Sequence, residues 1–465
     1  MQNPTKTIIS IAVAGIMANQ TTFAGSFALY TEISAAEIGN FAAGAAAEAA
    51  DASIGFYNPA GLALLHRQQI VLSGVGVLPS SKLTGTSTFS TTDYDPYIQS
   101  FSNLQGGESA VVPALHYAQP LGERATFGLS IFSPFGLSTN WGEHSPVRYS
   151  ATLTELLTVD VSPELGGLVT KNFAVGGGID FQWANVKFNR ILGAPAALQA
   201  LQNMGGLVTP TTLDSSSDNQ GHSFGTGFHA GVLGLFNDNH TRAGLNYQSR
   251  VKHQFNGSST LTGRLADPLL TNIEEVFTED VLYSNQVPLP SQTTFSLYQD
   301  INPRLAFLGS VIYTGWSCFQ TVQLNQVAAF SSDLGSIILA DSSTEENYKD
   351  AWRFALGANY HINDQWMLRT GGGYDETPTV NAQRDVRLPD ANRWALSIGG
   401  HYQMRPYLGF DLGYTYLWAQ NDPIVNKTDQ LGPTSTYNVD AKAKVHAQLI
   451  GLQAVWLIDH ELATK

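Results

Sequence analysis

Long runs in which apolar residues alternate with small or polar ones constrain this chain more than any other sequence feature. In the run 408–418, Leu, Phe, Leu, Tyr, Tyr and Trp occupy every second position, and mostly Gly, Asp and Thr lie between them. The runs 393–403 and 446–458 repeat the pattern. Each run has about the nine to eleven residues that a tilted strand needs to cross a bilayer. The alternation therefore predicts membrane-spanning strands with one face toward lipid and the other toward a small, polar lumen.

The composition favours a membrane protein built from strands over a soluble or helical protein. Charged residues make up 13% of the 465 residues, roughly half the share in soluble proteins. After the first 25 residues there is no run of 18 or more apolar residues, as a membrane-spanning helix would need. A soluble β-sandwich also alternates, but its strands are rarely so long and its outer face would carry more charge. A transmembrane β-barrel fits these features best.

Residues 1–24 predict a secretory signal peptide. They contain one lysine, an apolar stretch from Ile8 to Met17, and small residues before a cleavage point after Ala24. A single N-terminal membrane anchor is the alternative, and the shortness of the apolar stretch argues against it. The formal net charge of −14, without basic clusters, argues against nucleic acid as a partner.

No convincing catalytic or metal site can be found in the sequence. The segment GHSFG at 221–225 matches the G-x-S-x-G turn of hydrolases, but that turn needs a helix after it, and a strand pattern follows here. The 11 histidines show no metal-ligand spacing, and the single cysteine, Cys318, cannot form an intramolecular disulfide. We therefore expect no enzyme activity, cofactor or metal. A barrel lipase that uses Ser223 remains the alternative from the enzyme class.

Two insertions between the strand patterns have apolar residues at helical spacing. These residues are Leu198, Leu201 and Met204 in the first insertion and Ile273, Val276 and Phe277 in the second. The spacing predicts two loop helices. They either pack on themselves or act as amphipathic flaps whose apolar faces receive a hydrophobic ligand.

The segment 350–402 resembles the C-terminal part of the FadL/TodX (OmpP1) family of outer-membrane transporters of hydrophobic compounds. It contains W-R-x-A-L-G-x-x-Y, R-x-G-x-x-Y-D-E-x-P and L-P-D-x-x-R-W. The motifs NPA at 58–60, PFGL at 134–137 and W-S-x-F at 316–319 occur upstream in the family's order. The resemblance thus covers nearly the whole chain after the signal peptide, and the combination is more specific than any single motif.

This resemblance implies an all-β fold, a transmembrane antiparallel β-barrel of 14 strands plugged by an N-terminal hatch. The hatch would comprise residues 25–61, the barrel 62–458, and a C-terminal tail 459–465. The local chemistry agrees, because residues 25–57 are rich in Ala, Gly and Ser and can fill a lumen without a core of their own. After Asn58, Pro59 would end the hatch element and keep it out of the sheet, with Ala60 completing the turn.

The family resemblance also implies passive uptake of long-chain fatty acids or similar hydrophobic molecules across the outer membrane of a Gram-negative bacterium. Extracellular loops at 191–210 and 265–285 would capture the ligand, and a lumen pocket near Phe27 would receive it. A gap in the wall would then release it sideways into the membrane. The alternative within the family is transport of aromatic or aliphatic hydrocarbons.

The ligand site implied by the family contains an arginine for the fatty-acid carboxylate, and the matching position is Arg190. The alternative for Arg190 is a strand-end arginine that faces water or lipopolysaccharide. The family's second basic position falls near Thr344, where this chain has no cation, so a neutral hydrocarbon stays open as substrate. We expect three further arginines to form lumen charge networks with Asp375, Glu376 and Asp390. These are Arg369, Arg387 and Arg393.

The remaining expectations concern partners. A barrel of this kind would contact outer-membrane lipid and lipopolysaccharide, need the barrel-assembly machinery, and act as a monomer. Barrels of this family usually end in an aromatic residue, whereas here DHELATK follows the last apolar strand pattern. The sequence leaves open whether assembly uses an internal signal or the tail is a periplasmic extension.

Overall fold

The computed structural model describes residues 27–331 and 334–458. The predicted signal peptide and C-terminal tail lie outside the described residues. Among the described residues, no helix has the length and apolar character needed to cross a membrane.

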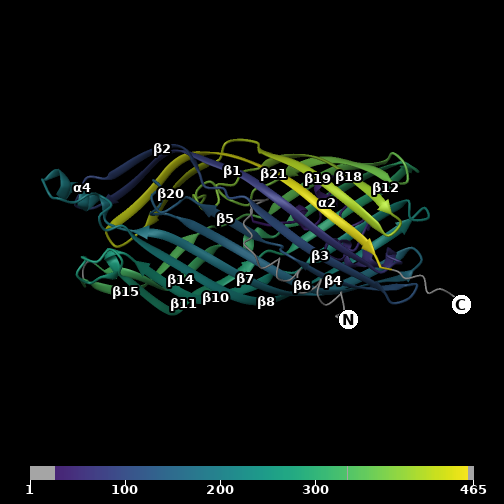
Figure 1. Ribbon diagram of the computed structural model, residues 1–465, viewed down its shortest axis with the longest axis horizontal. Coiled ribbons are helices and arrows are strands. Elements are labelled where there is room, and N and C mark those ends of the chain that lie inside the picture. Colours follow the sequence, from purple (N-terminus) through teal and green to yellow (C-terminus); the bar gives the residue numbers. More distant parts are fainter. Residues whose placement is uncertain (1–26, 332–333, 459–465) are drawn as a thin grey trace.

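The described chain forms a closed antiparallel β-barrel of 14 wall strands (Figure 1), which confirms the predicted fold class. Seven wall strands are continuous. They are β1 (Gln69–Thr91), β6 (Leu153–Thr170), β7 (Phe173–Leu192), β8 (Ser215–Phe236), β17 (Trp366–Asp375), β18 (Arg393–Arg405) and β21 (Ser435–Leu457). The barrel closes where β1 pairs with β21 over its whole length, from Gln69 opposite Leu457 to Thr91 opposite Ser435.

The other wall strands are each interrupted and consist of two segments. The pairs are β2 (Tyr97–Gln105) with β3 (Ala110–Pro120), β4 (Ala125–Phe132) with β5 (Gly136–Asn140), β9 (Thr241–Gln248) with β10 (Val251–Thr262), β11 (Val276–Leu289) with β12 (Gln292–Asn302), β13 (Leu305–Thr314) with β14 (Thr321–Ser331), β15 (Ser336–Glu345) with β16 (Ala351–His361), and β19 (Leu408–Ala419) with β20 (Ile424–Gln430). One segment of each pair lies near one end of the barrel and its partner near the other.

The alternation predicted from the sequence is present in the wall. On β18, Leu396 and Ile398 are 63% and 62% exposed on the outer face, while Ala395 between neighbouring outward residues is buried. Aromatic side chains form two rings at the borders of this apolar outer face, as in other membrane barrels. The first ring, called the outer aromatic ring, consists of Trp183, Phe224, Tyr313, Trp352, Tyr374, Trp394 and Trp418. The second consists of Phe236, Tyr360, Trp366, Tyr402 and Trp456.

The two ends of the barrel differ in loop length. Short turns such as 171–172 and 362–365 join strands at one end, and long connections such as 193–214 and 376–392 join them at the other. Outer-membrane barrels have short periplasmic turns and long extracellular loops. The end with α4 (Pro195–Asn203), β15 and β20, on the left of Figure 1, is therefore extracellular.

The two loop-helix predictions have different outcomes. Residues 195–203 form α4, as predicted. The prediction of a helix around Ile273–Phe277 is wrong, because β11 begins at Val276 and pairs with β10, with Phe277 opposite Leu261. Apolar residues three and four positions apart fit a helix locally, but pairing with the neighbouring strand decides the conformation here.

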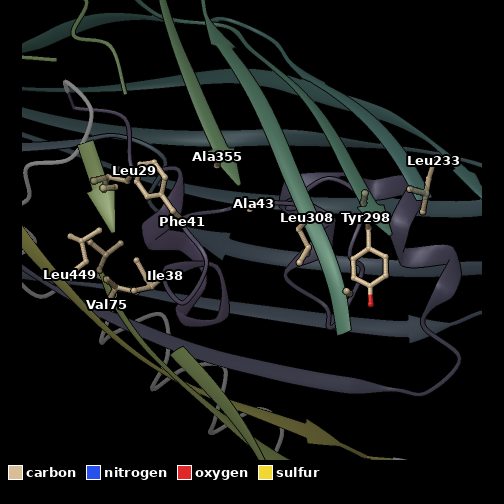
Figure 2. Close-up of a cluster of buried hydrophobic side chains, with 14 of the residues drawn as sticks. Leu29, Ile38, Phe41, Ala43, Val75, Leu233, Tyr298, Leu308, Ala355 and Leu449 are labelled. Carbon is tan, nitrogen blue, oxygen red and sulfur yellow. The ribbon is translucent and has the colours of Figure 1, made fainter. Parts of the chain in front are cut away.

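The chain that precedes β1 lies inside the barrel. Its short helices are η1 (Thr31–Ile33), α2 (Ala35–Ile38), α3 (Ile54–Tyr57) and η2 (Pro59–Leu64). Helix α2 contacts β18, β19 and β21, while η2 contacts β4, β6, β7 and β8 on another part of the wall. Figure 2 shows Ile38 and Phe41 of this segment in the core with the wall residues Val75, Leu308 and Leu449. Residues 27–65 therefore occupy the lumen, and we call them the lumen segment.

Small residues allow this segment to pack against the wall backbone. A Cβ atom at Gly371 would lie 2.2 Å from the carbonyl oxygen of Asn40, and one at Gly244 would lie 1.9 Å from that of Ala46. Both distances are far shorter than real contacts of a Cβ atom, so only glycine fits at these two wall positions.

The NPA turn ties the lumen segment to the wall. The Asn58 side chain accepts a hydrogen bond from Ala60 N–H (3.1 Å) and donates to the carbonyls of Ala46 (2.7 Å) and Val232 of β8 (3.0 Å). Pro59 is the first residue of η2, where its missing N–H is tolerated. Pro59 therefore separates α3, which ends at Tyr57, from η2, and the lumen segment continues past this residue rather than ending there. The proposed hatch boundary after residue 61 falls within η2.

Candidate functional site

An apolar cavity lies in the extracellular half of the barrel, beside the first described residue. Its empty volume is about 700 Å³, part of which is open to solvent. Side chains from several strands line it, from β5 and β6 round to β14. The apolar lining comprises Phe27, Leu137, Leu156, Val186, Phe188, Phe255, Val287, Leu289, Phe319, Val322, Leu324, Tyr348 and Leu388. Such a lining suits a hydrophobic solute.

Phe27 is held between the cavity and an aromatic cluster. Its ring packs edge-on against Trp316 (centroids 4.5 Å apart) and Phe319 (5.4 Å), and Trp316 is only 1% exposed. These two residues are the Trp and Phe of the W-S-x-F motif. The motif thus serves to hold the start of the lumen segment.

The wall is interrupted next to Phe27. Strand β3 pairs with β4 only from Leu115 to Pro120, and β4 ends at Phe132. Beyond this point β5 pairs with β6 on its other side. Within the described residues, it is linked back toward β2 and β3 by one β-bridge, Gly107 to Thr139, and by hydrogen bonds that Ser138 and Asn140 donate to the Glu108 carboxylate. The wall therefore has a break on its extracellular side, between β3 and β5, and we call it the wall break.

The lumen segment binds directly at this break. Ala28 forms an isolated antiparallel bridge with Phe135. Leu29 N–H donates to the Pro134 carbonyl (2.8 Å), and Gly136 N–H donates to the Phe27 carbonyl (2.9 Å). Cavity, lumen segment and wall break thus meet at residues 27–29.

Charged groups gather at one side of the cavity. Glu155, Glu346, Asp385 and Arg387 line it there. Asp385 lies 3.3 Å from Arg387 Nη1 and 3.3 Å from Lys427 Nζ, and both cations are largely buried. Burial raises the pKa of the Asp385 carboxyl, but Lys427 and Arg387 outweigh this effect and hold it below its usual value.

The pKa of Glu346 is shifted in the opposite direction. This residue lies in the loop between β15 and β16, beyond Trp352 of the outer aromatic ring and therefore outside the membrane-spanning part. Burial, together with the negative charge of Asp385, raises the pKa of Glu346 to about 8. This carboxyl is thus mostly protonated near neutral pH.

The structure does not bring together the ligand residues predicted from the sequence. Phe27 lines the cavity. Arg190, near the end of β7, is not among the lining side chains, but its charge interacts with Arg387 and Asp429. Leu198 is buried on α4, which packs against β1 and β2, and Leu201 of the same helix is 46% exposed. Phe277 packs on a separate extracellular cluster around Leu261 and Leu265.

Lys427 is a cation near the cavity that the sequence analysis missed, as it missed the lining carboxyls Glu346 and Asp385. The family's second basic position falls near Thr344, where this chain has no cation. Lys427 of β20 lies beside this position, because its Nζ donates to the carbonyl of Glu345 (3.2 Å). No local sequence signal marks it, because β20 and β15 are far apart along the chain.

The predicted lumen charge networks are confirmed in part. Arg393 pairs with Asp375 (2.8 Å) and Asp390 (3.8 Å), as predicted, and Arg353 also pairs with Asp375 (3.0 Å). The prediction is wrong for Arg369, whose partners are Glu48 of the lumen segment (2.7 Å) and Asp411 (3.5 Å).

Two further predicted network members also differ. Arg387 pairs with Asp385, and the Glu376 carboxylate accepts a hydrogen bond from Trp352 N–H (3.2 Å) rather than pairing with an arginine.

Ser223 does not sit on a strand-to-helix turn. It lies within β8, and its hydroxyl accepts a hydrogen bond from Gln254 N–H (3.2 Å). The geometry that exposes a nucleophilic serine in hydrolases is therefore missing at this position.

Barrel, lumen segment and apolar cavity together define an outer-membrane transport protein rather than an open, water-filled pore or an enzyme. The model of the outer membrane protein transport protein family (OMPP1/FadL/TodX) matches residues 15–456, and the chain belongs to this family. A long-chain fatty acid transport protein of Salmonella typhi is 30% identical over 431 residues, covering 90% of this chain and 93% of the relative. Outer membrane protein P1 of Haemophilus influenzae is 27% identical over 472 residues, covering 95% and 97%.

Solved structures show the same fold. A FadL homologue of Pseudomonas aeruginosa superposes with a TM-score of 0.78 at 24% identity, covering 93% of this chain and all of that one. The toluene transporter TbuX of Ralstonia pickettii gives 0.62 at 18% identity, covering 93% and 100%.

Proposed function

We propose that this protein takes up long-chain fatty acids across the outer membrane without an energy source. The observation that carries the proposal is an apolar cavity with Arg387 at its charged side, next to both the lumen segment and the wall break. Several relatives are named long-chain fatty acid transport proteins, which supports this substrate class.

The chemistry of the cavity matches both parts of such a ligand. Each methylene of an alkyl chain gains roughly 0.8 kcal/mol when it leaves water for an apolar site. The carboxylate needs a cationic donor, because an unpaired buried charge is expensive. Arg387 provides one at the cavity, and we propose Arg190 and Lys427 as the cations that support it.

The proposed route has three steps. Exposed apolar side chains of the extracellular loops, including Leu201, Leu207 and Ile273, capture the solute. The solute moves into the cavity beside Phe27. It leaves through the break between β3 and β5 when residues 27–29 release the wall.

Several further expectations from the sequence belong to this proposal. Residues 1–24 are removed as a signal peptide, 25–61 act as a hatch, and 459–465 form a tail. The barrel is a monomer that contacts outer-membrane lipid and lipopolysaccharide and is inserted by the barrel-assembly machinery.

Transport of neutral hydrocarbons is the second candidate. It is favoured by the largely apolar remainder of the cavity and by the pairing of Arg387 and Lys427 with Asp385. Toluene transporters share the fold.

Equilibrium binding to the detergent-purified barrel separates the two candidates. We expect Arg387→Ala and Arg190→Ala each to weaken hexadecanoate binding by about 1–3 kcal/mol, the typical effect of losing a charged partner. Hexadecane binding should stay unchanged in both. Lys349→Ala removes an exposed cation nearby and serves as the control. Hexadecanoate binding that neither arginine affects would contradict the fatty-acid function.

A further inference from the structure

Glu346 lines the cavity beside a cluster of positively and negatively charged side chains. Asp385 and Arg387 reach it from the 376–392 loop, and Lys427 and Asp429 reach it from β20. Tyr348, on its own loop, shares a hydrogen bond with it. Arg190 of β7 interacts with two members of this cluster, Arg387 and Asp429. Glu155 also lines the cavity, but Lys187 pairs with it at 2.8 Å.

When Glu346 is ionised, the charges of this cluster are balanced before any ligand arrives. Three cations face three carboxyl groups, namely Arg190, Arg387 and Lys427 against Glu346, Asp385 and Asp429. A bound anionic headgroup would add one negative charge to a poorly solvated site. Balance is restored if one carboxyl takes up a proton. Asp385 is held ionised by its two direct cation contacts, and Asp429 accepts a hydrogen bond from Ser150 (3.0 Å).

We propose that this cavity binds an anionic headgroup only while Glu346 is protonated, so that binding takes up a proton from solvent wherever Glu346 is otherwise ionised. The cavity accepts the anion with Glu346 protonated, and an ionised Glu346 competes with the ligand for Arg387 and Lys427. Release of the anion returns the proton to solvent. This inference rests on the proposed binding of fatty acids and adds a means of control to it.

The electrostatics of the site agree with this role. Burial and Asp385 raise the pKa of Glu346 to about 8, which puts its titration in the neutral to mildly alkaline range. Burial lowers the pKa of Lys427, but Asp385 and Glu346 outweigh this and raise it above its usual value, so Lys427 remains charged throughout. Anion affinity should therefore fall as the pH rises through the titration of Glu346.

A permanently charged probe isolates the effect of Glu346 protonation on binding, because the carboxyl group of a fatty acid itself changes its charge with pH. Hexadecanesulfonate stays anionic at every pH used, and its binding to the full barrel in non-ionic detergent is measured at pH 7.0 and 9.5. With a pKa near 8, the protonated fraction of Glu346 falls from about 90% to about 3%, so binding weakens roughly 30-fold. Hexadecane, measured in parallel, should show no such change.

Two variants assign the effect to one carboxyl. Glu346→Gln, which mimics the protonated form, should bind the sulfonate with less than a threefold difference between the two pH values. Glu345→Gln changes the neighbouring exposed carboxyl, and sulfonate binding to this variant should depend on pH as it does in the original chain. Equal pH dependence in the Glu346→Gln variant and the original chain would overturn the inference.

A second measurement needs no variant. Calorimetric titration of the original chain at pH 8.5, in buffers of different ionisation enthalpy, should show about 0.75 proton taken up per bound sulfonate. Uptake near zero would overturn the inference while leaving the fatty-acid function intact. If the sulfonate fails to bind at either pH while hexadecane binds, the fatty-acid function itself fails, and the inference with it.

Discussion

At the scale of single residues, Phe27 links the cavity to the lumen segment. Its ring lines the cavity on one side and packs against Trp316 and Phe319 on the other. We expect Phe27→Ala to weaken hexadecanoate binding by about 1–2 kcal/mol through lost apolar contact, measured by equilibrium binding to the purified barrel. Phe173→Ala, at a lipid-facing phenylalanine that is 40% exposed, is the matched control. Equal affinity in the Phe27 variant would show that the solute does not contact this ring.

At the scale of elements, α4 and the residues after it present apolar side chains to solvent. Leu201 is 46% exposed and Leu207 fully exposed, so neither stabilises the fold appreciably. Replacing both by serine should leave thermal stability unchanged but slow the initial uptake of labelled hexadecanoate several-fold at low concentration, if these residues capture the solute. Gln202→Ser, on the same helix, is the control and should leave the initial rate of uptake unchanged. A normal initial rate in the double variant would remove α4 from the proposed route.

The elements also show how far the sequence alone can lead. The bilayer demands an apolar outer face and small inner residues, so the alternation on β18, β19 and β21 predicts the wall directly. The local spacing around Phe277 fits a helix, and only pairing with Leu261 of β10 makes it a strand residue. Pro59 predicts a break in the chain, but the helix that follows it is stabilised by contacts with the wall, which no local pattern shows.

The candidate site was less predictable than the wall. Phe27 and Arg190 could be named only by resemblance, and no local pattern marks Arg387 or Lys427 as neighbours of the cavity. Their meeting at Asp385 depends on how the 376–392 loop and β20 lie across the extracellular mouth. Charge pairs that join distant segments leave no periodic signal in a sequence.

At the scale of the whole molecule, the central claim is that a solute leaves the cavity through the wall break once residues 27–29 release it. Ala28 and Phe135 lie directly opposite each other, and the hydrogen bonds on either side come from their neighbours. Such a pair brings the two Cβ atoms close enough for a disulfide. The double variant Ala28→Cys and Phe135→Cys, with Cys318→Ser to remove the single native thiol, can therefore lock the lumen segment to the break.

The most direct test is uptake of labelled hexadecanoate by cells that lack their own transporter and produce this locked variant. We predict that the oxidised variant, once purified, still binds hexadecanoate, that cells carrying it show no uptake, and that uptake returns when the disulfide is reduced. The Cys318→Ser chain alone should transport in both conditions. Equal uptake by the oxidised and reduced forms of the locked variant would contradict the proposed exit through the wall.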